Sequence, residues 1–442
     1  MFAYYFRLSL RSFRRNVILT GLMVLAIGVG IGASMTTLTI FRAMAADPIP
    51  GKSGELFTPQ IDNYGPVNLG PDTQRFQTPD RLPTSLTYLD AVALMRAHAA
   101  PRQAAMYATN VAVTPADPKQ LPFRVPTRAT YADFFPMFEV PFEYGAPWSA
   151  SDDQARAPLV VITRQLNDRL YGGVNSVGRT LTLNGDAYRI VGVADTWHPT
   201  PRFYDLNNAF DYGGAEQLYL PFTRAIAQQI HSNGLSCLKP VGSGWQTLLG
   251  SECIWTTVWV ELPTAAAVRA YRSFLFNYAQ AQRDSGRFHW PAKVALRNVR
   301  QWLAYRQIVP QDVSTLVLVS FAFLGVCLLN ALGLMLAKFM ARLGQVSVRR
   351  ALGADQRAIL AQCIVESGTL GLTGAAAGLG FTLLGLTMAR GLFANATSVL
   401  TRLNGGDIAI AIGVSLVTTM LAGLYPSWRA SQVQPAWQLK TQ

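Results

Sequence analysis

An uncharged apolar segment from Val17 to Phe41 is the strongest constraint on the fold. At about 1.5 Å per helical residue it would reach about 37 Å, enough to cross a hydrocarbon core of about 30 Å with some tilt. Four arginines come before it, namely Arg7, Arg11, Arg14 and Arg15. Positive charge beside an apolar span marks its cytoplasmic side. We therefore predict a cytoplasmic amphipathic segment over residues 1–16 and a membrane helix over residues 17–45.

A cleaved signal peptide is the alternative interpretation of this segment. The sequence Ala43-Met44-Ala45 resembles a cleavage site. The apolar core of a signal peptide is about 7–15 residues long, however, and this run is longer. The sequence therefore favours a retained membrane helix.

The composition supports a membrane protein. Of the 442 residues, 50% are apolar and 14% are charged, against about 25% charged in an average soluble protein. The net charge of +13 alone would suggest nucleic-acid binding. However, residues 46–312 contain 24 basic and 22 acidic residues, whereas the rest of the chain contains 14 and 3. The basic excess therefore lies beside the apolar stretches, as the positive-inside rule predicts.

Three further apolar stretches predict membrane helices over residues 313–337, 358–390 and 408–426. The basic clusters then place the N-terminus, residues 338–357 and the tail 427–442 in the cytoplasm. Residues 46–312 and a short loop over 391–407 lie on the other side. The predicted fold class is thus a membrane α + α/β protein. It has four transmembrane helices, and a large external mixed α/β domain is inserted between helices 1 and 2.

The external region shows local signals of both strands and helices. Residues 159–162 form a short apolar run typical of a buried strand, and residues 164–171 have a helical pattern. Asn184-Gly185 predicts a hairpin turn between strands at 180–183 and 188–193. Residues 264–282 again have a helical pattern. Proline and glycine are dense over 46–83 and 199–244, which indicates long loops and is compatible with two subdomains.

Several motifs resemble known sites but lack the required context. Gly173 to Thr180 has P-loop spacing, but Arg179 replaces the lysine and a hairpin, not a helix, is expected to follow. His98, His198, His231 and His289 are scattered, so we expect no metal site. No catalytic constellation is visible, and we expect the chain not to be an enzyme. Small residues in the spans, Gly28, Gly30, Gly32, Gly374 and Gly378, indicate close helix packing.

Two side-chain sites remain as candidates. Cys237 and Cys253 both fall in the external region, where an oxidising environment would favour a disulfide over two free thiols. Cys327 and Cys363 lie in spans and are expected to pack as small apolar residues. Glu366 is the acidic residue inside a predicted span, and a carboxylate in lipid is costly. It either pairs with a basic or hydroxyl group of a neighbouring helix or takes part in coupling or in a polar pathway.

The cytoplasmic segment 341–357 is basic and amphipathic. Gly353 can end a helix, and Asp355 can cap the next one. A short helix on the cytoplasmic face is expected here. It is either an interfacial anchor or a docking helix for a cytoplasmic partner.

Taken together, the motifs resemble those of MacB/FtsX-like ABC transporter permeases. The similarity is carried by residues 342–354 (Arg-Leu-Gly-Gln-Val-Ser-Val-Arg-Arg-Ala-Leu-Gly-Ala), 359–366, 423–430, 129–135 and 170–193. The resemblance implies a four-span permease with its external domain after the first span. It also implies that residues 342–354 form the helix that couples to a separate cytoplasmic ATPase, which would bind ATP and Mg. The matching coupling positions are Arg342, Gln345, Arg349, Arg350 and Gly353.

The chain departs from the family pattern at Gln345, where the family usually has an acidic residue, and at Ser347, where glycine is frequent. One hypothesis is that the chain is one half of a heterodimer. The resemblance further implies a second permease subunit and no cofactor in this chain. A periplasmic adaptor protein and membrane lipid are further possible partners.

The family resemblance implies a permease of the bacterial inner membrane, with cytoplasmic termini, that relays ATPase motion to its periplasmic domain for export. The substrate would be a peptide, a drug-like molecule or a lipid-linked molecule. A lipoprotein-releasing permease is one alternative, and an FtsX-like regulator of a periplasmic cell-wall hydrolase is another. The large external domain favours the exporter.

Overall fold

The structure is a computed structural model, and it divides into two compact units. One unit is Ala46–Ile308, and the other combines Met1–Ala45 with Val309–Gln442. We call them the α/β unit and the membrane unit. The described residues are 13, 16–65, 82–206, 216–309, 311–341, 348 and 355–392, with isolated positions between 406 and 420.

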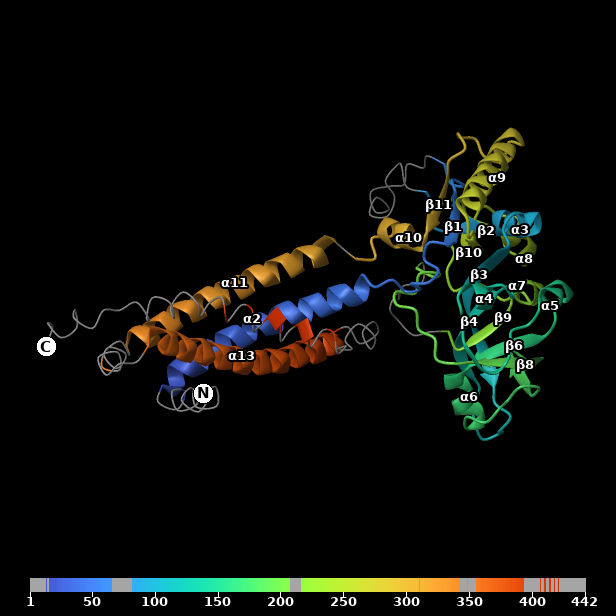
Figure 1. Cartoon of the computed structure of the whole chain (residues 1–442). Helices are drawn as coiled ribbons and strands as arrows, with labels where there is room; N and C mark the ends of the chain where they lie inside the picture. The colour runs from blue at the N-terminus through green and yellow to red at the C-terminus, as the bar shows by residue number, and fades with distance from the viewer. Residues whose placement is uncertain are drawn as a thin grey trace. The chain divides into compact units, whose positions relative to one another are not determined.

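The described part of the α/β unit is built on an eleven-stranded sheet (Figure 1). The main path through it runs β11-β1-β10-β3-β4-β9-β6-β8-β5, while β2 pairs with β10 and β7 pairs with β3 and β8. The strands are β1 (Leu56–Ile61), β2 (Leu86–Thr87), β3 (Arg102–Thr114), β4 (Phe123–Thr130), β5 (Phe142–Gly145), β6 (Leu159–Thr163), β7 (Thr180–Leu183), β8 (Asp186–Ala194), β9 (Leu218–Pro221), β10 (Ile254–Glu261) and β11 (Val294–Asn298).

Strand β3 belongs to both halves of this sheet. Its first residues, 102–106, pair with β10, and its later residues, 107–113, pair with β4. Most pairings are antiparallel, but β6 runs parallel to β8 and β4 runs parallel to β9. The α/β unit is therefore a mixed sheet whose two halves share one strand.

Apolar residues that alternate along the strands fill two cores, one on each face of the sheet. Val160 and Ile162 of β6 enter one cluster, whereas Leu159 and Val161 enter the other. Side chains of a strand point alternately to opposite faces, so this pattern requires helices or loops on both sides.

Eight short and medium helices provide this cover within the described α/β unit. They are α3 (Tyr88–Ala97), α4 (Phe134–Met137), α5 (Ala150–Ala155), α6 (Arg164–Tyr171), α7 (Phe222–Ala227), α8 (Trp245–Leu249), α9 (Ala265–Asp284) and α10 (Val299–Tyr305). Residues of α3, α6, α7, α8 and α9 fill the first cluster, and residues of α4 and α10 fill the second.

The local sequence signals predicted several of these elements. The strand at 159–162, the helix at 164–171 and the helix at 264–282 correspond to β6, α6 and α9. The predicted hairpin is also present, because β7 pairs antiparallel with β8 and both turn residues, Asn184 and Gly185, have positive φ. The segments rich in proline and glycine are not loops throughout, since they contain β1, β9 and α7.

The membrane unit contains three helices that are long and apolar enough to cross a membrane, among the described residues. They are α2 (Val17–Met44), α11 (Gln311–Met340) and α13 (Gln356–Leu392). The α/β unit lies between α2 and α11 in the chain. The fourth predicted span, 408–426, lies largely outside the described residues. Of its isolated described positions, Ile410 and Val414 pack against the apolar cluster of α2 and α11.

Candidate functional site

Glycines set the contact between α2 and α13. A Cβ added at Gly374 would lie 2.6 Å from Cγ2 of Ile27, and one added at Gly378 would lie 2.7 Å from Cγ2 of Ile31. On the facing helix, a Cβ at Gly32 would collide with the Cβ of Phe381. Side chains larger than hydrogen do not fit at these positions, so the two backbones approach closely. This confirms the interpretation of these residues as helix-packing positions.

Hydroxyl groups connect α2 with α11. The Ser34 hydroxyl donates to the Ser320 carbonyl at 2.8 Å, and the Thr37 and Ser320 hydroxyls are 2.8 Å apart. Four residues earlier on α2, a Cβ at Gly30 would touch Cys327, which lies seven residues after Ser320. The two helices therefore run antiparallel. The contacts of Ile27 with Gly374 and of Ile31 with Gly378 show that α2 and α13 run parallel.

The third helix contact contains a buried ion pair. Nζ of Lys338 on α11 lies 2.8 Å from Oε1 of Glu366 on α13, and both side chains are buried. The Lys338 ammonium also lies 5.0 Å from the centre of the Phe13 ring. Close by, the Ser367 hydroxyl lies 3.4 Å from Sδ of Met335. A charge in an apolar environment is tolerated when an opposite charge compensates it, so each member of this pair permits the burial of the other.

Lys338 stands at the end of its span, as predicted, but its side chain is buried. Helix α11 continues to Met340, and Lys338 is 2% exposed. The predicted ATPase-coupling residues Arg342, Gln345, Arg349, Arg350 and Gly353 lie outside the described residues. On the far side of that segment, α13 begins at Gln356, directly after Asp355. The ion pair thus joins α11, two residues before its end at Met340, to α13, ten residues after its start at Gln356.

The α/β unit contains a second buried ionic cluster. The guanidinium of Arg128 on β4 donates to Asp205 and to Glu216, and its Nε lies 3.0 Å from Oε1 of Glu216. Arg202 and the Tyr204 hydroxyl also donate to Glu216, at 3.2 and 2.8 Å. Burial raises the pKa of the Glu216 carboxyl, but Arg128 and Arg202 outweigh this and lower it to about 2. The carboxylate is therefore charged at neutral pH, and the cluster is compensated internally.

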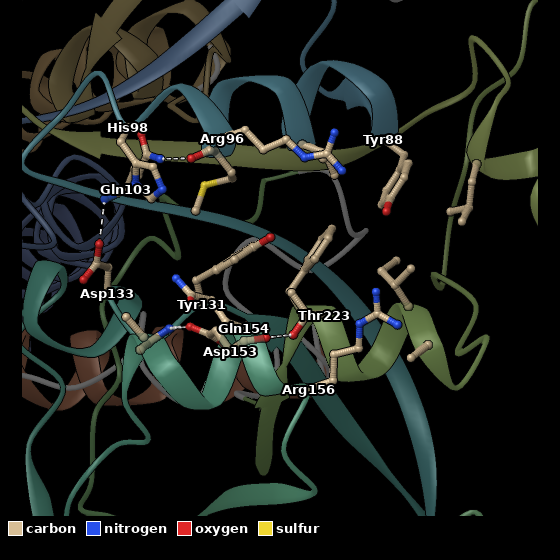
Figure 2. A pocket seen from close by; sticks show the side chains of 18 of the residues that line it. Tyr88, Arg96, His98, Gln103, Tyr131, Asp133, Asp153, Gln154, Arg156 and Thr223 are labelled. Carbon is tan, nitrogen blue, oxygen red and sulfur yellow. Dashed lines mark hydrogen bonds between the residues drawn. The ribbon is translucent and has the colours of Figure 1, made fainter.

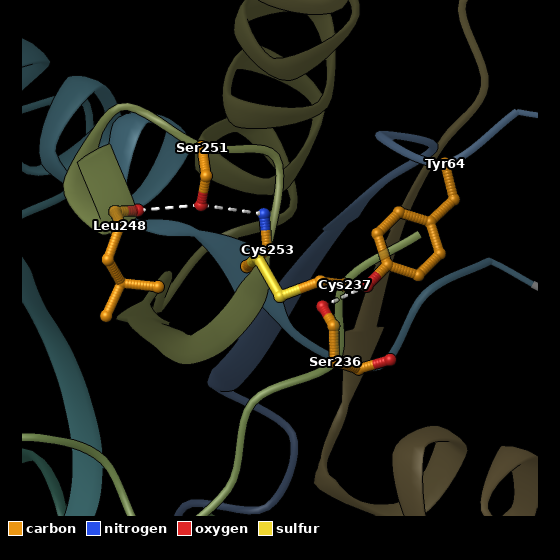
Figure 3. Close-up of a disulfide and its surroundings, with 6 residues drawn as sticks. All are labelled: Tyr64, Ser236, Cys237, Leu248, Ser251 and Cys253. Carbon is orange, nitrogen blue, oxygen red and sulfur yellow. Dashed lines mark hydrogen bonds between the residues drawn. A yellow bond between two sulfur atoms is a disulfide. The ribbon is translucent and has the colours of Figure 1, made fainter. Parts of the chain in front are cut away.

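Cys237 and Cys253 form a disulfide that closes a segment 16 residues long (Figure 3). Ser236, next to Cys237, pairs with Ile254, next to Cys253, through two backbone hydrogen bonds. The Tyr64 hydroxyl donates to the Ser236 carbonyl. The bond therefore fastens the end of β10 to the loop before α8. Cys327 is a buried free cysteine in α11.

The segment with P-loop spacing leads into a strand and not into a helix. The chain passes from Arg179 directly into β7, so the segment 173–180 has no helix N-terminus that could hold a phosphate. Instead, the Arg179 guanidinium lies over the Tyr171 ring. Within the described residues, no group of three or more potential metal ligands was found.

Two family models match separate parts of the chain. The model of the MacB-like periplasmic core domain matches residues 20–273, more than half of the sequence. The model of the FtsX-like permease C-terminal region matches residues 317–435. The chain belongs to the MacB/FtsX-like family of ABC transporter permeases. The resemblance found in the sequence motifs is thereby confirmed, and the match to the MacB-like periplasmic core domain covers residues 46–273 of the α/β unit.

Two relatives of this MacB/FtsX-like permease share low sequence identity with it. The pyoverdine export ATP-binding/permease protein PvdT of Pseudomonas aeruginosa is 22% identical over 70% of this chain and 41% of its own length. The macrolide export ATP-binding/permease protein MacB of Rhodospirillum rubrum is 22% identical over 98% of this chain and 59% of its own. The chain thus spans about half the length of these relatives.

A solved structure was also found for the periplasmic region of MacB from Actinobacillus actinomycetemcomitans. It is 13% identical, covers 58% of this chain and 94% of that chain, and has a TM-score of 0.36.

Proposed function

We propose that the chain is the permease subunit of an ABC exporter and transmits the motion of a separate cytoplasmic ATPase to its periplasmic domain. ATP and Mg would be bound by the ATPase, and a second permease subunit would complete the membrane part. The observation that carries the proposal is the pair of family matches, with the periplasmic core domain model before the FtsX-like permease model in one chain.

The packing of the membrane unit supports such a relay. Residues 341–355, which contain the proposed coupling positions, connect the C-terminal end of α11 with the N-terminal end of α13. The Lys338–Glu366 pair joins the C-terminal end of α11 to the first three turns of α13. A force applied to the connecting segment would therefore move α11 and α13 together. The glycine contacts would pass that movement from α13 to α2.

The chain connectivity then links the helices to the α/β unit. Helix α2 ends at Met44 and α11 begins at Gln311, and the α/β unit occupies the sequence between them. Because α2 and α11 are both covalently continuous with this unit, a shift of either helix would act on it. Such a relay requires two states of the permease, one of which the ATPase favours in its ATP-bound form.

The proposed setting is the bacterial inner membrane, with the termini in the cytoplasm. The alternating direction of α2, α11 and α13 suits three successive crossings, and the arginine-rich N-terminus suits a cytoplasmic start. The names of two relatives refer to macrolide export and to pyoverdine export, which supports export of a drug-like or peptide substrate. A periplasmic adaptor protein is a further proposed partner.

The first experiment is purification of the tagged full chain from native membranes, with every co-purifying protein identified. Recovery of an ATPase with Walker motifs would support the proposal, and a second permease beside it would indicate a heterodimer. Recovery of a periplasmic hydrolase instead would favour the FtsX-like regulator. Recovery of a lipoprotein would favour the lipoprotein-releasing permease.

The coupling role is tested by Arg349→Glu in the reconstituted complex. We expect at least about a tenfold loss of the ATPase activity that depends on the permease, because a repulsive charge would replace a docking cation. The control is Arg272→Glu, the same charge change at an exposed position of α9. Equal activity of the wild type and Arg349→Glu would refute the docking role.

A further inference from the structure

The α/β unit contains a cavity of about 650 Å³ that the proposed relay does not use. It lies beside the first apolar cluster, and its walls come from α3, α5, α7, α8 and the segments next to β3 and β4 (Figure 2). Cavities of about 300–1,000 Å³ are the usual size for small-molecule sites. The chemistry of the walls therefore decides which class of molecule it suits.

One wall of the cavity is aromatic. Tyr88, at the start of α3, and Phe222, at the start of α7, have nearly parallel rings with centres 6.3 Å apart. The ring of Tyr131 lies 5.3 Å from that of Phe222 and is tilted by 25°. Phe222 is buried in the apolar core, so the wall is anchored. Tyr88 and Tyr131 are only partly buried, so their rings offer an apolar surface on which a planar group can stack.

Two guanidinium groups border the same space. Arg96 comes from the last turn of α3, and Arg156 is the left-handed residue that ends α5. Figure 2 shows their side chains on different sides of the space beside Tyr88. Both residues are exposed. Within the described part of the chain, neither guanidinium has an ion-pair or hydrogen-bond partner.

Two phenol groups add hydrogen-bond donors. The hydroxyls of Tyr88 and Tyr131 have no partner among the described residues. Burial raises the pKa of both phenols, so both remain protonated and able to donate. Guanidinium and phenol donors that converge on one space are suited to a carboxylate or phosphate oxygen.

The acidic residues of the cavity wall already have donors of their own. Asp133 accepts the Gln103 backbone N–H at 3.0 Å. Asp153 accepts the Ala132 backbone N–H and the Trp148 indole N–H, at 2.8 and 2.9 Å. Burial raises the pKa of the Asp153 carboxyl to about 7, although these two donors lower it. The Asp153 carboxyl is thus partly protonated near pH 7, so it repels an anion less than a fully ionised carboxylate would.

We propose that this cavity binds a small amphipathic anion, in which a carboxylate or phosphate is joined to a planar apolar group. The planar group stacks on the partly exposed rings of Tyr88 and Tyr131, and the anionic group lies between Arg96 and Arg156. The proposal concerns binding by the α/β unit and does not depend on an ATPase or on transport.

The test is calorimetric titration of the full chain in phosphatidylcholine nanodiscs with 2-naphthoate and with its neutral analogue 2-naphthamide. Empty nanodiscs give the background heat. We expect saturable binding of naphthoate and at least about tenfold weaker binding of naphthamide, because charge-assisted hydrogen bonds are lost. Absence of saturable naphthoate binding at millimolar concentration, or equal affinity for both compounds, would overturn the proposal.

The double variant Arg96→Gln/Arg156→Gln tests the assignment of the cations. It is expected to lower naphthoate affinity about tenfold and to leave naphthamide affinity unchanged. The matched control is Arg272→Gln/Arg283→Gln, which removes the same charge from exposed positions on α9. An equal loss of naphthoate affinity in the control would show that net charge, and not this site, attracts the anion.

A milder variant keeps the aromatic wall and removes only the hydroxyls. Tyr88→Phe/Tyr131→Phe is expected to weaken naphthoate binding about threefold and to preserve naphthamide binding. Unchanged naphthoate affinity in both double variants would place the anion elsewhere and refute the assignment.

Discussion

In the α/β unit, large side chains fill the interior, whereas in the membrane unit the closest contacts are made by the smallest residues. Trp259, Tyr107 and Phe222 are among the fully buried side chains that pack on the sheet. In the membrane unit, Gly32 and Gly378 occupy helix contacts that leave no space for a Cβ. The two units thus reach close packing by opposite means.

The difference follows from the surroundings of each unit. In water, burying a large apolar side chain removes apolar surface from the solvent and is strongly favourable. In a bilayer, lipid chains are as apolar as leucine, so burying a leucine between helices gains little. Backbone proximity and polar contacts then decide how helices associate. The exposed apolar residues of α11, such as Leu318 and Leu329, suit a lipid environment.

The buried ionic sites of the two units also differ. Arg128 forms ion pairs with the carboxylates of both Asp205 and Glu216. Glu216 in turn accepts hydrogen bonds from Arg202 and Tyr204. Lys338 pairs with the single carboxylate of Glu366. The Arg128 cluster includes a residue of the sheet, whereas Lys338 and Glu366 lie on two helices that residues 341–355 connect. We therefore expect the first to be structural and the second to be sensitive to motion of the helices.

The largest effect is expected for Arg128→Met. Removal of the guanidinium leaves buried carboxylates without their main partner, at a cost of about 3–5 kcal/mol in the free energy of unfolding of the α/β unit. Urea unfolding followed by tryptophan fluorescence measures this. Arg124→Met, at an exposed position on the same strand, is the control. The triple variant Arg128→Met/Asp205→Asn/Glu216→Gln should recover part of the loss, and no recovery would contradict the charge argument.

An intermediate effect is expected for Gly32→Ala. The new methyl group would collide with Phe381 and force α2 and α13 apart, which costs about 1–3 kcal/mol. In a Cys363→Ser background, maleimide labelling of the buried Cys327 should become about tenfold faster. Gly21→Ala adds the same methyl group where no atom lies within 4 Å and should leave the rate unchanged. Equal rates for the two variants would argue against close packing of these helices.

The smallest effect is expected for the interaction between Lys338 and Glu366. A double-mutant cycle of Lys338→Met and Glu366→Gln should give a coupling of about 1 kcal/mol in helix association, again measured by Cys327 labelling. Each single variant should be worse than the double one, because each leaves a charge in an apolar environment. Additive effects would mean that the pair does not join α11 with α13.

The parts of the fold that the sequence predicted are those set by neighbouring residues. The β7–β8 hairpin follows from Asn184-Gly185 between two alternating segments, and α6 and α9 follow from helical periodicity. The Arg128 cluster had no such signal, because its partners Asp205 and Glu216 lie 77 and 88 residues away. The order of the sheet strands also depends on distant pairings, such as those of β1 with β10 and of β4 with β9.

The sequence predicted only one member of the ion pair in the membrane unit. Glu366 stood out because a carboxylate inside an apolar run is costly in lipid unless a partner compensates its charge. Its partner was hidden because Lys338 stands at the end of an apolar run, where a cytoplasmic flank is the ordinary interpretation. Only the antiparallel contact of α11 with α13 brings the two residues together. The cavity of Tyr88, Arg96 and Arg156 was not predicted, since four helices and the segments next to β3 and β4 form it.

Strand β3 also has a mechanical consequence. Thirteen residues at about 3.3 Å each make a continuous beam of about 43 Å, and the two halves of the sheet are fastened to successive lengths of it. The two halves of the sheet cannot separate unless the hydrogen bonds of β3 with β10 or those of β3 with β4 break. A load taken up at either half is therefore carried along a single backbone, and anything that stiffens one half restrains the other.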